Sequence, residues 1–171
     1  SEIGAIEKLT AQLDQNNQVQ YQLPLAAINN QTQPQSIALN PLIGKMLTLH
    51  FHNKIACKHC GKSTKKSYSQ GFCYPCMSKL AQCDMCIMKP ETCHHHLGTC
   101  REPQWGEAHC MVDHYVYLSN TSALKVGITR HTQLPTRWID QGATQALPIF
   151  KVSTRLQSGL VETALARKAV P

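Results

Sequence analysis

The chain has 171 residues, of which 42% are hydrophobic and 16% charged, and its formal net charge is +7. This composition excludes a highly charged disordered chain. No apolar run approaches about 18 residues, so we expect neither a transmembrane helix nor a membrane partner. The first residues show neither the basic nor the apolar region of a secretory signal.

The first predicted domain, residues 1–56, is rich in Gln and Asn. Apolar and polar residues alternate at 19–23 and again at 47–52, which is typical of half-buried strands. Residues 29–34 between them have the composition of a loop. We therefore expect a small antiparallel β unit here.

The second predicted domain, residues 57–110, contains all nine cysteines of the chain. Three pairs share the C-x2-C spacing, namely Cys57 with Cys60, Cys73 with Cys76, and Cys83 with Cys86. This spacing and the odd count favour metal binding over a disulfide framework. Metal-binding thiols indicate a reducing compartment, so we expect the protein in the cytoplasm. The segment has few apolar residues, and a structural zinc ion can replace a core by contributing about 10–16 kcal/mol.

The first two pairs predict a four-cysteine zinc site. Cys57 and Cys60 precede Gly61 as in a zinc knuckle, and the second pair begins after twelve intervening residues, a zinc-ribbon or treble-clef spacing. Four protein ligands leave no open coordination position, so the site should be structural. The alternative is a redox-active C-x2-C pair.

Cys83 and Cys86 predict a second structural zinc site, but the spacing does not decide its other two ligands. We favour Cys93 and Cys100, with Cys110 or a histidine in place of one of them as the main alternative. The candidates for these two positions are Cys93, His94, His95, His96, Cys100, His109, Cys110 and His114.

Lysines near the first site predict contact with nucleic acid. They are Lys54, Lys58, Lys62, Lys65 and Lys66, with no acidic residue among them. Such a local positive surface attracts phosphates, whereas each zinc bound by four thiolates would lower the overall charge by two. Arg130 is a further candidate for phosphate contact.

The third predicted domain, residues 111–171, has α/β patterning. We expect strands at 114–118, 124–128 and 148–152, the first two forming a hairpin. With the β unit and the zinc segment, this gives an α+β protein.

Two helices are expected in the third domain. Thr132 is expected to cap the first helix, with Pro135 in its first turn and its end at Gly142. Ser158 is expected to cap the last helix, whose core-facing residues would be Leu160, Ala164 and Leu165. We also expect the natural protein to continue beyond this helix.

Two short motifs and two charged residues follow one another along the third domain. They are Tyr115-Val116-Tyr117, Lys125-Val126-Gly127, Arg137 and Glu162. In this order they resemble the GIY triplet, the YIG triplet, the helix arginine and the metal-binding glutamate of the GIY-YIG nuclease superfamily. The whole chain resembles an uncharacterised bacterial family that joins a cysteine-rich zinc segment to a degenerate GIY-YIG-like domain. The stretches that carry this second resemblance are 83–86, 98–103, 105–107, 125–129 and 135–143.

The resemblance implies a phosphodiesterase. Glu162 would hold Mg²⁺ or Mn²⁺, which would polarise the scissile phosphate. Arg137 would stabilise the charge of the transition state. Tyr117 would activate water, provided that nearby positive charge lowers its pKa.

The chain departs from the superfamily motif at two positions. Lys125 replaces the second tyrosine, and it can bind a phosphate. Gln141 stands where the superfamily has a helix histidine, and His131 is a candidate base in its place.

Each proposed catalytic residue also has a structural interpretation. Tyr117 can be a strand aromatic at the edge of a core, Arg137 can pair with Asp140 on its helix, and Glu162 can favour the helix dipole. Three functions therefore remain open. They are a metal-dependent nuclease, a non-catalytic binder of RNA, DNA or a ribonucleoprotein, and a zinc-folded protein-interaction module.

Overall fold

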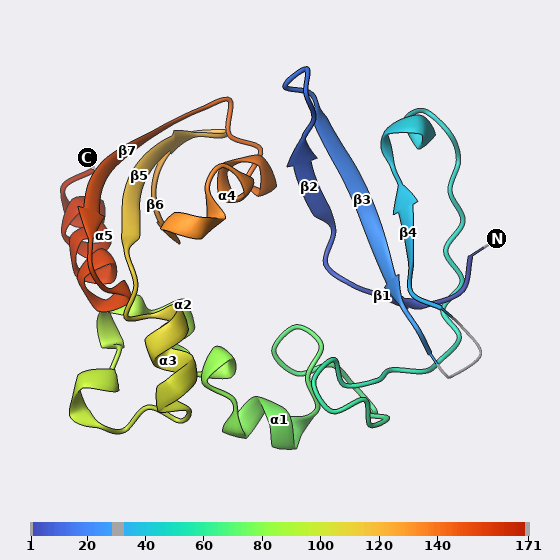
Figure 1. Cartoon of the computed structure of the whole chain (residues 1–171), viewed down its shortest axis with the longest axis horizontal. Helices are drawn as coiled ribbons and strands as arrows, with labels where there is room; N and C mark the ends of the chain where they lie inside the picture. Colours follow the sequence, from blue (N-terminus) through green and yellow to red (C-terminus); the bar gives the residue numbers. More distant parts are fainter. Residues whose placement is uncertain (1, 29–32, 170–171) are drawn as a thin grey trace. The chain divides into compact units, whose positions relative to one another are not determined.

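The computed structural model describes residues 2–28 and 33–169 and divides into two compact units, Ser1–Lys54 and Ile55–Pro171 (Figure 1). Both units contain antiparallel sheets, and the chain is mixed α+β, as the sequence predicts. The predicted boundaries after residues 56 and 110 stay predictions. No helix in the described part of the chain is long and apolar enough to cross a bilayer.

The first unit is built around one central strand. Its strands are β1 (Ala5–Ile6), β2 (Thr10–Leu13), β3 (Val19–Ala26) and β4 (Gln35–Ala38), followed by the 3₁₀ helix η1 (Asn40–Leu42). β3 pairs antiparallel with each of the other three strands. The Asn40 side chain satisfies backbone groups in the first half of β3. It accepts from the Tyr21 amide at 2.8 Å and donates to the Val19 carbonyl at 2.8 Å. The predicted strand at 19–23 is therefore confirmed.

The predicted strand at 47–52 is wrong. These residues have no regular structure, and Leu49 and Phe51 are 77% and 68% exposed. The alternation exists in the sequence, but a strand forms only where a neighbour accepts its backbone hydrogen bonds. Residues 29–32 of the predicted loop lie outside the described residues.

The second unit begins with a segment of short elements. They are α1 (Tyr74–Lys79), η2 (Ala81–Cys83), α2 (Met85–Met88), η3 (Pro90–Thr92), η4 (His95–Leu97) and α3 (Pro103–His109). Its small core consists of Cys57, Phe72, Cys73 and Leu80. Two of these four residues are cysteines, which agrees with a segment too poor in apolar residues to fold on packing alone.

The rest of the second unit is a three-stranded antiparallel sheet with two helices. Its elements are β5 (His114–Asn120), β6 (Leu124–Arg130), the 3₁₀ helix η5 (His131–Gln133), α4 (Thr136–Asp140), β7 (Gln145–Val152) and α5 (Arg155–Ala169). The strand order is β6-β5-β7, so all three predicted strands and the predicted hairpin are confirmed. α5 packs on this sheet (Figure 1). Val116 and Tyr117 of the central strand are completely buried.

The predicted start of the first helix is wrong. α4 begins at Thr136, with Pro135 rather than Thr132 at its N-cap position. Leu134 is extended, with φ −93° and ψ 139°, because the residue before a proline is sterically kept from helical angles. The helix can therefore begin no earlier than Pro135.

The predicted cap of the last helix is also wrong. α5 starts at Arg155, and the Thr154 hydroxyl accepts from the Gln157 amide at 3.2 Å. Ser158 lies inside the helix, is fully buried, and donates to the Arg155 carbonyl at 2.7 Å. Leu160, expected in the core, is 53% exposed, and Ala164 is exposed as well.

Gly159 brings α5 against the cysteine-rich segment. A Cβ atom at this position would lie 2.5 Å from the Glu91 amide nitrogen and 2.6 Å from Pro90 Cβ. Only a glycine allows a helix to approach another backbone this closely. The sheet and the cysteine-rich segment are therefore joined through direct contact between α5 and η3.

Candidate functional site

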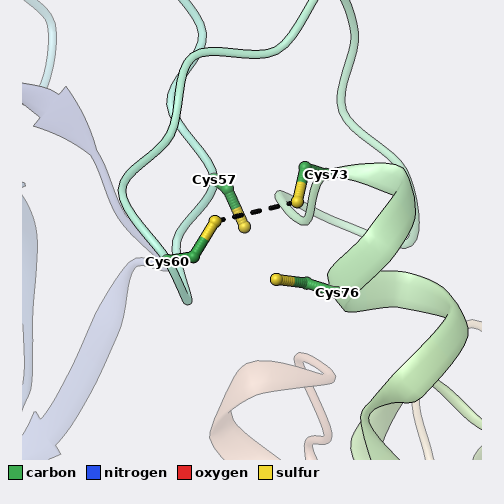
Figure 2. A group of neighbouring side chains, drawn as sticks. All are labelled: Cys57, Cys60, Cys73 and Cys76. Atoms are coloured by element: carbon green, nitrogen blue, oxygen red, sulfur yellow. Dashed lines mark hydrogen bonds between the residues drawn. The ribbon is translucent and has the colours of Figure 1, made fainter.

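Four cysteines converge where the second unit begins (Figure 2). The sulfur atoms of Cys57, Cys60, Cys73 and Cys76 all lie within 4.8 Å of one another, and those of Cys60 and Cys73 are 3.8 Å apart. Zinc–sulfur bonds of about 2.3 Å in a tetrahedron require sulfur–sulfur distances of about 3.8 Å. This cysteine cluster can hold a metal ion, and its donor set and spacing fit zinc.

Local backbone geometry presents the four thiols. The Gly61 amide donates to the Cys57 carbonyl at 2.8 Å, and Gly61 adopts a left-handed φ of 70° that suits glycine. This tight turn places the thiols of Cys57 and Cys60 on one side of the cysteine cluster (Figure 2). Cys73 is the N-cap residue of α1, and Cys76 lies in its first turn, so the helix start aims the second pair at the first.

The thiols influence one another's ionisation. Burial raises the pKa of Cys57, but backbone amides of Cys60, Cys73 and His59 donate to its sulfur and bring that pKa down to about 6. Burial and the neighbouring thiols raise the pKa of Cys76 to about 12. A thiolate at one position repels the negative charge of a second thiolate beside it. A bound divalent cation offsets this repulsion and stabilises all four thiolates.

The second set of predicted zinc ligands is divided by the structure. Cys83 packs beside the core around Cys57 and Phe72, whereas Cys86, Cys93 and Cys100 line a separate cavity. Asp84, between the two halves of this C-x2-C pair, is extended at φ −69° and ψ 152° as the N-cap of α2. The two thiols of this pair therefore lie in different surroundings. Cys110, one of the alternatives, lines the same cavity.

Most of the histidines considered as alternative zinc ligands contact other groups, although His95 also lines the cavity. His95 Nε2 lies 3.2 Å from the Pro103 carbonyl oxygen, and His109 stacks on Trp105 with a centroid distance of 4.2 Å. His96 is exposed, and the fully buried His114 has its Nδ1 atom 2.7 Å from the Val112 carbonyl oxygen.

Asp84, Cys86 and His94 form a second group whose ligand atoms lie within 4.8 Å of one another. Asp84 Oδ2 already accepts from Arg101 Nε at 2.7 Å, and it lies 3.7 Å from His94 Nε2. The carboxylate is thus neutralised by Arg101, so this group is better described as an ion pair than as a cation site.

The predicted lysines surround the cysteine cluster in sequence, and all of them are exposed. Lys58 Nζ lies 4.3 Å from the centre of the Phe72 ring, and Lys66 Nζ lies 4.8 Å from the centre of the Tyr68 ring. Tyr74, which the sequence analysis did not single out, is 59% exposed and contacts Tyr68 edge-on with a centroid distance of 5.6 Å.

Arg130 and His131 lie elsewhere in the second unit. Arg130 is half-buried and affects the titration of Cys110 and Arg155, so its charge acts at the cysteine cavity. The His131 amide donates to the Asp113 carbonyl at 3.0 Å, and its ring Nδ1 atom lies 3.3 Å from the same oxygen.

Tyr117 is the centre of a cluster on the sheet. Its hydroxyl donates to Gln141 Oε1 at 2.7 Å, and its ring meets the Trp138 ring edge-on at 6.0 Å between centroids. Gly127 is its cross-strand partner, where a Cβ atom would lie 2.6 Å from the tyrosine ring. Lys125 is exposed two residues from Gly127, on the same face of the sheet.

The charges of Arg137 and Glu162 act on Tyr117. Burial raises the Tyr117 pKa, the Arg137 guanidinium lowers it by hydrogen bonding and by charge, and Glu162 raises it. Burial also raises the pKa of Glu162 itself, which feels the charges of Arg155, Glu91 and Arg137. Glu91 and Arg155 could not be singled out from the sequence, because nothing in their local sequence distinguishes them from surface residues.

The comparison with protein families found one match. Residues 44–170 match the family described as Protein of unknown function (DUF2797). Because this match covers well over half of the chain, the chain belongs to that family, in agreement with the predicted resemblance to an uncharacterised one. The comparisons with curated proteins and with solved structures gave no match.

Proposed function

We propose that the protein binds nucleic acid through a surface that zinc folds. This lysine surface consists of the five lysines of residues 55–79 in the second unit, with Tyr74 as its exposed aromatic residue. One observation carries the proposal: a segment held by four clustered cysteines displays exposed lysines and contains no acidic residue. A zinc ion bound by four thiolates leaves residues 55–79 with a net charge of about +3.

The chemistry of the lysine surface suits a polyphosphate. Lysine ammonium groups neutralise phosphates and release counterions, which makes affinity depend on salt. An exposed tyrosine offers a face on which an unpaired base can stack. If Lys58, Lys62, Lys65 and Lys66 each contact one phosphate, raising salt from 50 to 200 mM weakens duplex binding by about 150-fold and single-strand binding by about 50-fold.

Fluorescence anisotropy tests this proposal with labelled duplex DNA, duplex RNA and single-stranded RNA at several salt concentrations. Lys62→Gln combined with Lys65→Gln should weaken binding and reduce the salt slope by about two. Lys168→Gln, an exposed lysine in α5, is the matched control and should change little. Binding that is insensitive to salt or to the double substitution would point instead to a protein-interaction module.

A second candidate function is phosphodiester cleavage of the GIY-YIG type, and a specific observation favours it. Arg137 and Glu162 both act electrostatically on Tyr117, although the three residues come from α4, α5 and β5. Glu91 acts on Glu162 in turn, so two carboxylates influence one position. Carboxylates of this kind can hold Mg²⁺ or Mn²⁺, which would supply Lewis-acid chemistry at a phosphate.

In this candidate function, each residue of the site would have its own role at the phosphate. The exposed Arg137 guanidinium offers a planar pair of donors to a phosphate. Lys125, on the Tyr117 face of the sheet, offers a second cation. Tyr117 keeps its proton at neutral pH, because burial raises its pKa, and its hydroxyl positions Gln141.

A cleavage assay on labelled DNA and RNA with Mn²⁺ or Mg²⁺ tests this candidate. Wild type is compared with Glu162→Gln and Arg137→Ala, with zinc content confirmed in each, and with Glu107→Gln as the exposed control. Activity lost in the first two variants and kept in the third supports a phosphodiesterase. Absent activity, or activity that survives in the first two variants, contradicts it.

A further inference from the structure

We propose that the cysteine cavity against α3 is a second structural zinc site, separate from the cluster at Cys57. Its ligands are Cys86, Cys93, Cys100 and Cys110. This set replaces Cys83 of the sequence-predicted set with Cys110. It does not depend on whether the protein binds nucleic acid.

The cavity brings together donors from four places in the chain. Cys86 lies in α2, Cys93 follows η3, and Cys100 and Cys110 stand on either side of α3. The free space admits about one water-sized sphere, which is the room that a single metal ion needs. Two cysteines placed around one short helix are thus directed at one enclosed point.

Helix α3 is pressed against this cavity. A Cβ atom on Gly106 would lie 3.2 Å from Cys100 Sγ and 2.7 Å from His95 Cδ2. The Cys110 amide donates to the Gly106 carbonyl at 2.7 Å, which fixes the end of the helix and the start of the Cys110 side chain. The glycine therefore sets the depth at which both thiols enter the cavity.

The other donors that line the cavity already have partners. Asp84 is paired with Arg101, the ring of His94 lies 2.8 Å from the Thr99 hydroxyl, and His95 lies beside a backbone carbonyl. Of the four thiols, that of Cys100 donates weakly to the Glu102 carbonyl at 3.5 Å, a contact that a thiolate bound to metal would give up. Four sulfur ligands are a standard zinc donor set.

The charges around the cavity match a four-thiolate zinc site. The Nε atom of Arg155 is buried and has no hydrogen-bond partner in the described part of the chain, although Nη2 donates to the Ile87 carbonyl at 2.7 Å. The charge of Arg155 acts on Cys110, Cys86 and Cys93, and Arg130 acts on Cys110 as well. A zinc ion with four thiolates carries a charge of −2, which two arginines balance.

The sulfur atoms of these four cysteines lie farther apart than those of the first cluster. Among the residues that the structure describes, no three of these sulfur atoms fall within 4.8 Å of one another. A change of one side-chain rotamer moves a cysteine sulfur by about 3 Å, and metal binding would draw the four sulfur atoms together by movements of this size.

Metal stoichiometry tests the proposal on the full chain purified in zinc. Wild type should carry two zinc ions, and both Cys110→Ser and Cys100→Ser should carry one. Cys83→Ser is the matched control and should keep two. Cys60→Ser should also carry one, because it disrupts only the first cluster.

X-ray absorption on the wild-type protein gives a measurement that needs no variant. Both zinc ions should show four sulfur neighbours at about 2.3 Å. A wild type that holds one zinc, a mean shell containing nitrogen or oxygen, or a Cys83→Ser variant that loses one zinc would each overturn the proposal.

Discussion

Replacing Gly159 with alanine tests how α5 is joined to the cysteine-rich segment. The added methyl group would lie 2.5 Å from the Glu91 amide nitrogen, 2.6 Å from Pro90 Cβ and 2.7 Å from the Pro90 carbonyl carbon. These are backbone atoms and a proline ring, which cannot rotate away as a flexible side chain would. The helix must therefore shift away from η3.

Two opposing effects set the size of this perturbation. Overpacking costs about 1–3 kcal/mol, and rigid neighbours favour the upper value. Alanine gains about 1 kcal/mol over glycine in a helix interior. The expected net loss in the free energy of unfolding is about 2 kcal/mol, or about 8 °C in Tm for a unit of this size.

Thermal unfolding of the full chain in zinc-containing buffer measures the effect. Leu160→Ala, one residue along the helix and largely exposed, should shift the free energy by less than about 0.5 kcal/mol. A Gly159→Ala protein as stable as wild type would refute the close contact between α5 and η3.

Four further predictions address other parts of the second unit. Cys60→Ser should lower the zinc content by one ion per chain, measured by metal analysis, because it removes one of four clustered ligands. Gly127→Ala should destabilise by about 1–3 kcal/mol in denaturant unfolding, because its Cβ would meet the buried Tyr117 ring. Tyr74→Ala should weaken single-stranded RNA binding about 5- to 150-fold in anisotropy titrations while leaving the salt slope unchanged. Burial raises the Glu162 pKa, so the stability this carboxyl contributes is present at acid pH and is lost as pH rises through the raised value. Glu162→Gln should therefore unfold at a higher temperature than wild type at neutral pH, with a difference that vanishes below the ordinary carboxyl range.

Part of the fold could be predicted because its signals are local. The strands at 114–118 and 124–128 are separated by a short polar turn, so pattern and pairing agree. The segment at 47–52 has a similar alternation but no partner strand, and pairing is a property of the whole unit. Sequence alternation alone does not report whether a neighbour is present.

The two C-x2-C pairs that the sequence treated alike differ for a physical reason. The turn after Cys57 closes through Gly61 in a left-handed conformation, and the glycine directly after Cys60 indicates this turn in the sequence. The pair at Cys83 spans an extended N-cap residue, so its two thiols lie in different surroundings. Such a difference depends on the backbone angles of Asp84, and the spacing does not encode them. The convergence of Cys110 and Arg155 is equally hidden, because it arises when α5 docks.

The exposure of the thiols in the first cluster decides how the cluster can be opened chemically. Cys57 and Cys73 are buried and Cys76 is half-buried, whereas Cys60 is exposed. An alkylating agent or a peroxide therefore reaches Cys60 first, since thiolate reactivity follows access as well as ionisation. Modification there would remove one of the four candidate ligands and leave three thiols to hold a metal ion.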